Sequence, residues 1–108
     1  MAGGFKLQSA ATTGNGQEID MRGEEGSYAL SIETSNATVS AGAVTWEEAP
    51  YVGYTGTWAE IMGALTPVQA SIVTARFTGA LNAVRARIST SVTGGATVTV
   101  RLLPPGVD

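Results

Sequence analysis

Hydrophobic and polar residues alternate along most of this chain, which is the pattern of strands that bury one face. The alternation is clearest near the C-terminal end. Small or apolar side chains alternate with arginine and serine in residues 84–92, and with threonine and arginine in residues 96–102. Because a short glycine-containing turn at residues 93–95 joins the two runs, the pattern predicts a β-hairpin. The prolines at 104–105 then end the ladder, since proline lacks the backbone donor.

The N-terminal half shows the same alternation with shorter runs. The expected strands of this half cover residues 5–10, 18–22, 28–33 and 37–48, and the expected turns cover residues 13–16, 23–26 and 35–36. Within residues 37–48 the alternation changes phase near Gly42. A β-bulge at that point would turn both Val44 and Trp46 toward the core.

The middle of the chain is less regular. Residues 68–77 are extended in pattern, with a change of phase between Ile72 and Val73, and Gly79 is expected to close this strand. Residues 50–67 contain three glycines and no sustained period. Within this segment, residues 58–65 fit either a short helical turn or an edge strand.

About seven or eight short strands separated by regular turns indicate an all-β, antiparallel β-sandwich of the jelly-roll kind. A length of 108 residues predicts a single domain over residues 1–108. Residues 1–7, with Gly3-Gly4 as a joint, form an N-terminal arm in this interpretation. The arm either frays or adds a strand to a neighbouring subunit.

The composition suggests how so small a domain is stabilised. There is no cysteine and no histidine in the chain, so disulfides and the usual zinc ligands are excluded. Oligomerisation is the remaining common support, and we expect a homo-oligomer, a trimer or a dimer. No apolar run approaches the length of a membrane span, and no signal peptide is visible. Association with a membrane is therefore not expected.

The amount and distribution of charge bear on the possible partners of the protein. The formal net charge of −3 argues against a nucleic-acid partner, because phosphate binding needs clustered lysine and arginine. Most acidic residues lie in the first 62 residues, and four of the arginines lie after them. Two interpretations remain open: cross-strand ion pairs within one sheet, or acidic and basic faces that meet between subunits.

Catalytic chemistry finds little support. Without histidine or cysteine, Ser-His and Cys-His nucleophile pairs are excluded, and Lys6 near the N-terminus is the one lysine available to a serine. The neighbours Glu47-Glu48 point to opposite faces of a strand, and Glu24-Glu25 lie in an expected turn. The spacing of Asp20, Glu24 and Glu25 does not match that of the ligands in an EF-hand calcium loop. We therefore expect no enzyme, no catalytic residue, no cofactor and no metal site.

The aromatic residues are the best candidates for recognition. We expect Trp46 to fill the core. For Tyr51, Tyr54 and Trp58, which lie among glycines, two roles remain open. They either cover the open end of the core or form an exposed surface that stacks on sugars or anchors a protein partner.

Several segments together resemble a known family. They are the Thr13-Gly14-Asn15-Gly16 turn before residues 18–21, the segment 54–58, the strand 84–89 and the glycine-led strand 94–100. In these strand-and-turn patterns the chain is similar to small β-sandwich structural proteins of tailed bacteriophages. Such modules occur in head decoration proteins, head fibres and tail proteins. Because the similarity ends with the last strand, we expect a stand-alone module.

The resemblance implies a virion structural protein, most simply a capsid decoration or cement protein on the outside of a phage head. Its partner would be the major capsid protein, and it would assemble in the host cytoplasm. The alternative is a glycan- or cell-surface-binding module of a phage fibre or tail. The candidate interface residues are Phe5, Lys6, Tyr51, Tyr54, Trp58, Arg85, Arg87 and Arg101.

Overall fold

The computed structural model describes residues 5–103, and in this range the chain forms strands and no helix. In chain order the strands are β1 (Phe5–Ala11), β2 (Ile19–Thr34), β3 (Ala41–Ala49), β4 (Ala59–Glu60), β5 (Ile72–Thr93) and β6 (Val98–Leu103). They form one antiparallel sheet of six strands in the order β1-β6-β2-β5-β3-β4. The predicted all-β, antiparallel fold is confirmed. Across the described range, no helix is long and apolar enough to cross a membrane.

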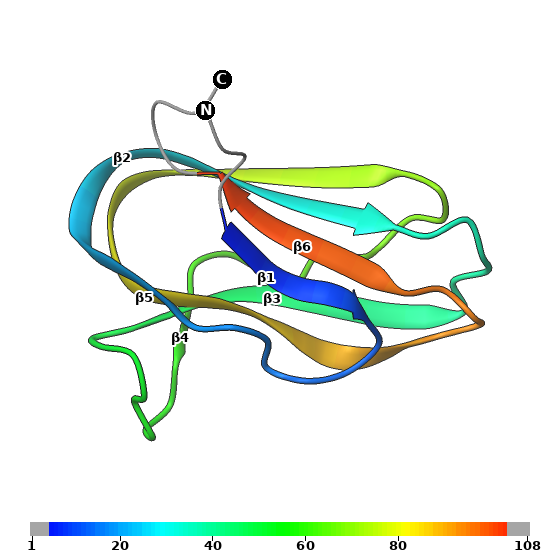
Figure 1. Ribbon diagram of the computed structural model, residues 1–108, viewed down its shortest axis with the longest axis horizontal. Coiled ribbons are helices and arrows are strands. Elements are labelled where there is room, and N and C mark those ends of the chain that lie inside the picture. Colours follow the sequence, from blue (N-terminus) through cyan, green and yellow to red (C-terminus); the bar gives the residue numbers. More distant parts are fainter. Residues whose placement is uncertain (1–4, 104–108) are drawn as a thin grey trace.

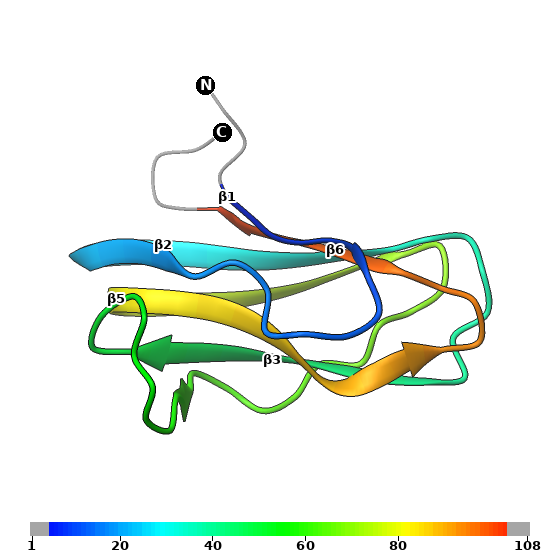
Figure 2. The ribbon, with the colours of Figure 1, turned by 60° about the horizontal axis from the view of Figure 1, so that its bottom comes forward.

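β2 and β5 are the longest strands, and they shape the sheet. From Ile72 to Val84, β5 pairs with β2, and from Ala83 to Thr93 it pairs with β3, so Ala83 and Val84 have partners on both sides. Figure 1 shows the two long strands curving together at one end of the molecule. After the curve, β1, β6 and the C-terminal part of β2 lie on one side, and β3 lies on the other (Figure 2).

The turn predicted at residues 23–26 is wrong, because these residues lie inside β2. Arg22 and Gly23 adopt left-handed backbone conformations, with φ angles of 57° and 69°. The register with β5 shifts between Asp20 and Glu24. Such a bulge bends a strand without ending it, so the polar glycine-bounded segment continues the ladder.

The strand end predicted at Gly79 is also wrong, since β5 continues to Thr93. Gly79 stands directly opposite Gly26 in the β2–β5 register. A pair of facing glycines removes the side chains that would resist bending of the ladder. The sheet has six strands instead of the predicted seven or eight, because the breaks predicted at residues 23–26 and at Gly79 are bends within β2 and β5.

The predicted hairpin of residues 84–102 is wrong in its pairing, although both strands exist. β6 lies between β1 and β2, whereas this part of β5 pairs with β3. The connection passes against the segment before β3: the Ser40 amide donates to the Thr93 carbonyl at 2.8 Å, and the Ala96 amide donates to the Thr38 carbonyl at 3.2 Å. Gly94 and Gly95 there have φ angles of 101° and 107°. The chain therefore crosses to the other side of the core instead of folding back on β5.

A single main core lies inside the curved sheet and receives side chains from β1, β2, β3, β5 and β6. The bulge predicted near Gly42 is confirmed, because the β3–β5 register shifts on both sides of Ala43. Val44 and Trp46 are fully buried, as predicted, and the Trp46 ring meets Phe77 edge-on at 6.2 Å. The largest fully buried side chains are those of Trp46, Tyr28, Leu7, Leu30, Ile32, Leu81, Leu102, Val44, Val84, Val98 and Val100.

Two predictions concern the ends and the irregular segment. Of the alternatives for residues 58–65, the edge strand is correct, since β4 pairs with β3 at one edge of the sheet. The expected N-terminal arm falls partly on residues 1–4, outside the described residues. Phe5 and Lys6 belong to β1 and pair with Leu102 and Arg101 of β6 in the same chain. The prolines at 104–105 also lie outside the described residues.

Candidate functional site

Charged side chains gather on the outer face of β3 and the second half of β5. Because Trp46 and Ala86 point into the core, their neighbours in each strand point outward. The register then places Glu47 opposite Arg85 and Thr45 opposite Arg87. The outward face of these two strands is therefore polar and charged.

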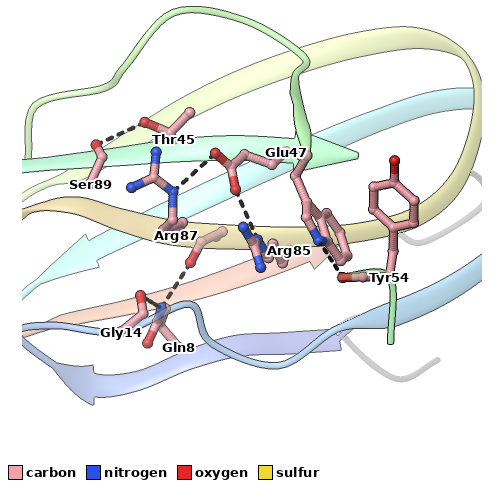
Figure 3. Close-up of polar contacts among 10 residues, drawn as sticks. Gln8, Gly14, Thr45, Glu47, Tyr54, Arg85, Arg87 and Ser89 are labelled. Carbon is pink, nitrogen blue, oxygen red and sulfur yellow. Dashed lines mark hydrogen bonds and ion pairs between the residues drawn. The ribbon is translucent and has the colours of Figure 1, made fainter. Parts of the chain in front are cut away.

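One carboxylate joins two arginines on this face (Figure 3). The Arg85 Nε donates to Oε1 of Glu47 at 2.8 Å, and the Arg87 Nε donates to Oε2 at 3.0 Å. Glu47 is 4% exposed, while the side chain of Arg87 is 36% exposed. These three side chains sum to a charge of +1, and Glu60 of β4 adds a second acid beside them, opposite Glu47 in the β3–β4 register. A buried carboxylate thus holds two guanidinium groups at the surface.

Trp58 connects this charged group to the aromatic residues of the loop before β4. Its ring lies under Arg85, whose Cζ is 4.2 Å from the ring centroid. The Trp58 indole Nε1 donates to the Tyr54 carbonyl at 3.1 Å. Tyr54 in turn meets the Tyr51 ring edge-to-face at 5.4 Å. A cation over an indole face is a favourable contact, more so when it is partly shielded from water.

Five of the eight predicted interface residues therefore lie in one place. We call Glu47, Tyr51, Tyr54, Trp58, Arg85 and Arg87 the arginine–aromatic cluster. Of its aromatic rings, Trp58 is buried and Tyr54 is half-buried, and Tyr51 is 59% exposed. Of the two roles left open, the burial of Trp58 agrees with covering the core, and for the exposed Tyr51 a role in recognition stays a prediction.

The other three predicted residues lie on the strands at the opposite edge of the sheet. Phe5 is 40% exposed on the edge strand β1. Lys6 stands opposite Arg101 in the β1–β6 register. Arg101 forms an ion pair with Glu33 of β2 at 3.1 Å, with both side chains well exposed. These residues do not join the arginine–aromatic cluster.

The ion pairs settle how the two halves of the charge pattern meet. Each pair joins an acid of the first half to an arginine of the second half within the one sheet. The first of the two charge interpretations, cross-strand pairing, is confirmed for Arg85, Arg87 and Arg101. Arg76, which is exposed on β5, forms no ion pair within residues 5–103.

Sequence reasoning missed the role of Glu47. The expectation that Glu47 and Glu48 point to opposite faces is correct: Glu48 instead accepts a hydrogen bond from the Asn82 amide at 2.8 Å. The phase of Trp46 alone places Glu47 on the outer face. The arginines that it meets could be found only from the β3–β5 pairing, because alternation does not specify which strands are neighbours.

Gln8 is a second buried polar residue that the sequence did not single out. Its side-chain amide donates to the carbonyls of Ala86 at 2.8 Å and Gly14 at 3.1 Å. These bonds tie β1 and the following loop to β5. The bonds are structural, because both acceptors are backbone groups.

The acidic residues considered for metal binding, Asp20, Glu24 and Glu25, lie along β2. Asp20 and Glu24 lie on either side of the β2 bulge, and Asp20 accepts a hydrogen bond from the Arg22 amide at 2.8 Å. In the part of the chain that the structure describes, no group of at least 3 acidic side chains is arranged to hold a metal ion. The arginine–aromatic cluster is therefore the main candidate site.

Comparisons with protein-family models, with curated proteins and with solved structures found no match for the chain.

Proposed function

We propose that this chain is a virion structural protein, a decoration or cement protein that binds the outside of a tailed-phage capsid as a homo-oligomer. In this proposal the curved sheet serves as a compact β-sandwich module of the jelly-roll kind. The observation that carries it is the edge strand β1. Within residues 5–103 it has one neighbouring strand, β6, and its Leu7 carbonyl also accepts a hydrogen bond from the Gln17 amide at 2.8 Å. The strand bears the exposed apolar ring of Phe5.

An edge strand with an exposed aromatic residue is suited to contact between subunits. Backbone groups at a free edge pair with a further strand, and an aromatic side chain anchors the contact by burying apolar area. Contacts of modest size gain strength when they repeat around a symmetric lattice. The partner would be the major capsid protein, the location the capsid surface, and the place of assembly the host cytoplasm.

The test adds purified protein to expanded capsids built from the major capsid protein of a tailed phage, chosen from the neighbourhood of the gene if one is encoded there. We expect co-sedimentation with the capsids and a higher capsid melting temperature. Phe5→Asp should weaken both effects. Val68→Asp is the matched control, because Val68 is similarly exposed at 50% and lies outside β1. A strictly monomeric protein that leaves capsid melting unchanged, or a gene neighbourhood without a capsid protein, would contradict the proposal.

A second candidate function, glycan binding on a phage fibre or tail, is favoured by Tyr51. Its ring is well exposed, and Tyr54 supports it edge-to-face. Exposed aromatic rings stack on the apolar faces of sugars. Tyr51→Ala should abolish glycan binding without unfolding the domain, and unchanged binding would remove this candidate.

A further inference from the structure

We propose that the arginine–aromatic cluster binds the carboxylate of an acidic sugar, so that its ligand is a carboxylated polysaccharide. This inference rests on the glycan-binding candidate and is independent of the capsid role. It names the chemical class of the glycan, which exposed tyrosines alone do not specify.

Unused hydrogen-bond donors are the first observation. Arg85 and Arg87 each donate a hydrogen bond from Nε to the Glu47 carboxylate. Their terminal amino groups make no hydrogen bond to any group in the described part of the chain, and none of these nitrogens is among its buried, unsatisfied atoms. The Arg87 side chain is 36% exposed and that of Arg85 is 13% exposed, so the terminal amino groups of Arg87 are the more accessible donors. The planar guanidinium fork matches the two oxygens of a carboxylate, which makes such charge-assisted bonds strong and directional.

The second observation is that the arginines are held in place before a ligand arrives. Glu47 is buried and accepts one hydrogen bond from each arginine, so both guanidinium groups are tethered at the same end. Arg85 is also packed on the Trp58 ring. Side chains that are already ordered lose less entropy on binding.

The adjoining aromatic residues favour a sugar over an acidic peptide. Contacts run without a break from Arg85 to Trp58, from Trp58 to Tyr54, and from Tyr54 to Tyr51. Arg85 covers the indole of Trp58, so stacking on a sugar ring falls to Tyr51. A chain of sugar acids offers a carboxylate for the arginines and an apolar ring face for the tyrosine. An acidic peptide would use the arginines and gain little from Tyr51.

The experiment measures binding to immobilised polygalacturonate and to its fully methyl-esterified form, which has the same backbone without the charge. We expect the protein to bind the acid form and to bind the ester at least about tenfold more weakly, as loss of a charge-assisted pair implies. Arg87→Gln should weaken binding to the acid form by a similar factor. Arg76→Gln, which removes the same charge from an exposed position on the same strand, should change it less than about twofold.

Two further variants keep the test decisive. Arg87→Lys retains the ion pair with Glu47 and the fold but loses the planar fork, so it should bind less tightly than the wild type. Equal losses in Arg76→Gln and Arg87→Gln would show nonspecific attraction and overturn the inference. If the ester binds as tightly as the acid and Tyr51→Ala removes both, the glycan candidate stands and the carboxylate inference fails.

Binding to polyglutamate tests whether the ligand is an acidic peptide instead of an acidic polysaccharide. If polyglutamate binds as tightly as polygalacturonate, with dependence on Arg87 and none on Tyr51, the site takes acidic peptides and the inference is wrong. Weak binding of polyglutamate, with loss of polygalacturonate binding in both Arg87→Gln and Tyr51→Ala, supports it. No outcome of these measurements depends on whether the protein binds capsids.

Discussion

Arg85 lies with its guanidinium carbon 4.2 Å from the centroid of the Trp58 ring, so a residue of the longest strand fixes the loop before β4. The same arginine donates its Nε to Glu47 on β3. One side chain thereby links the sheet to the aromatic loop. The stability and the proposed binding both depend on this arrangement, and it can be tested from either side.

Replacing Glu47 with glutamine should lower the free energy of unfolding by about 2 kcal/mol. Removing the buried carboxylate leaves two partly buried guanidinium groups without their shared counter-charge. Urea unfolding followed by tryptophan fluorescence measures the change. Glu33→Gln, which removes the exposed partner of Arg101, should cost less than about 1 kcal/mol. Equal losses in the two variants would show that burial of Glu47 has no special effect.

Replacing Gly94 with alanine should destabilise the protein by about 3 kcal/mol. A Cβ there would lie 2.6 Å from the Thr38 carbonyl oxygen and 2.8 Å from the Ser40 nitrogen, and φ is 101°. Backbone atoms cannot move aside easily, and this φ is strained for any L side chain. The control Gly63→Ala, whose Cβ would meet nothing within 4 Å, should change stability by less than about 0.5 kcal/mol. Thermal unfolding of both variants decides the matter, and a neutral Gly94→Ala would contradict the crossing of the chain at this point.

Stability should fall at alkaline pH through Tyr28. Burial, and to a smaller extent the charge of Glu24, raises the pKa of Tyr28 above its ordinary value of 10.0. The unfolded chain therefore loses this proton before the folded chain does. The stabilising contribution is complete below pH 10.0 and is lost as the pH rises through the raised folded pKa.

Tyr28→Phe provides the comparison. The variant should be about 1 kcal/mol less stable near neutral pH, because the Tyr28 hydroxyl donates to the Glu24 carbonyl at 2.6 Å. Its free energy of unfolding should then depend less on pH in the alkaline range than that of the wild type. Urea titrations on both sides of the ordinary tyrosine pKa measure the two slopes, and parallel slopes would exclude Tyr28 as the source.

Replacing Gln8 with leucine should cost about 1–2 kcal/mol, since the side chain is buried and donates to the carbonyls of Ala86 and Gly14. Amide hydrogen exchange should speed up in β1 if these bonds hold it to β5. Gln17→Leu alters an exposed glutamine nearby and should leave both measurements unchanged. Unchanged exchange in Gln8→Leu would show that the hydrogen bonds of Gln8 are not needed to hold β1.

Within each strand, the sequence predicted the buried face well. The phase change near Gly42, the burial of Trp46 and the opposite directions of Glu47 and Glu48 all follow from alternation, which is a local property of an extended backbone. Its failures concern glycines. Gly79 stands inside a strand that it was expected to end, and Gly94 stands in a crossing where a hairpin turn was expected.

The sequence by itself determined that this chain makes antiparallel strands with one apolar face, and that histidine and cysteine chemistry is absent from it. Tertiary structure alone decided that β6 pairs with β1 and β2, and that Glu47 meets Arg85 and Arg87. The physical reason is that alternation specifies the face on which a side chain lies and leaves the neighbouring strand open. Partners across a sheet depend on how the whole core closes, and a glycine permits a bend, a crossing or a turn equally well.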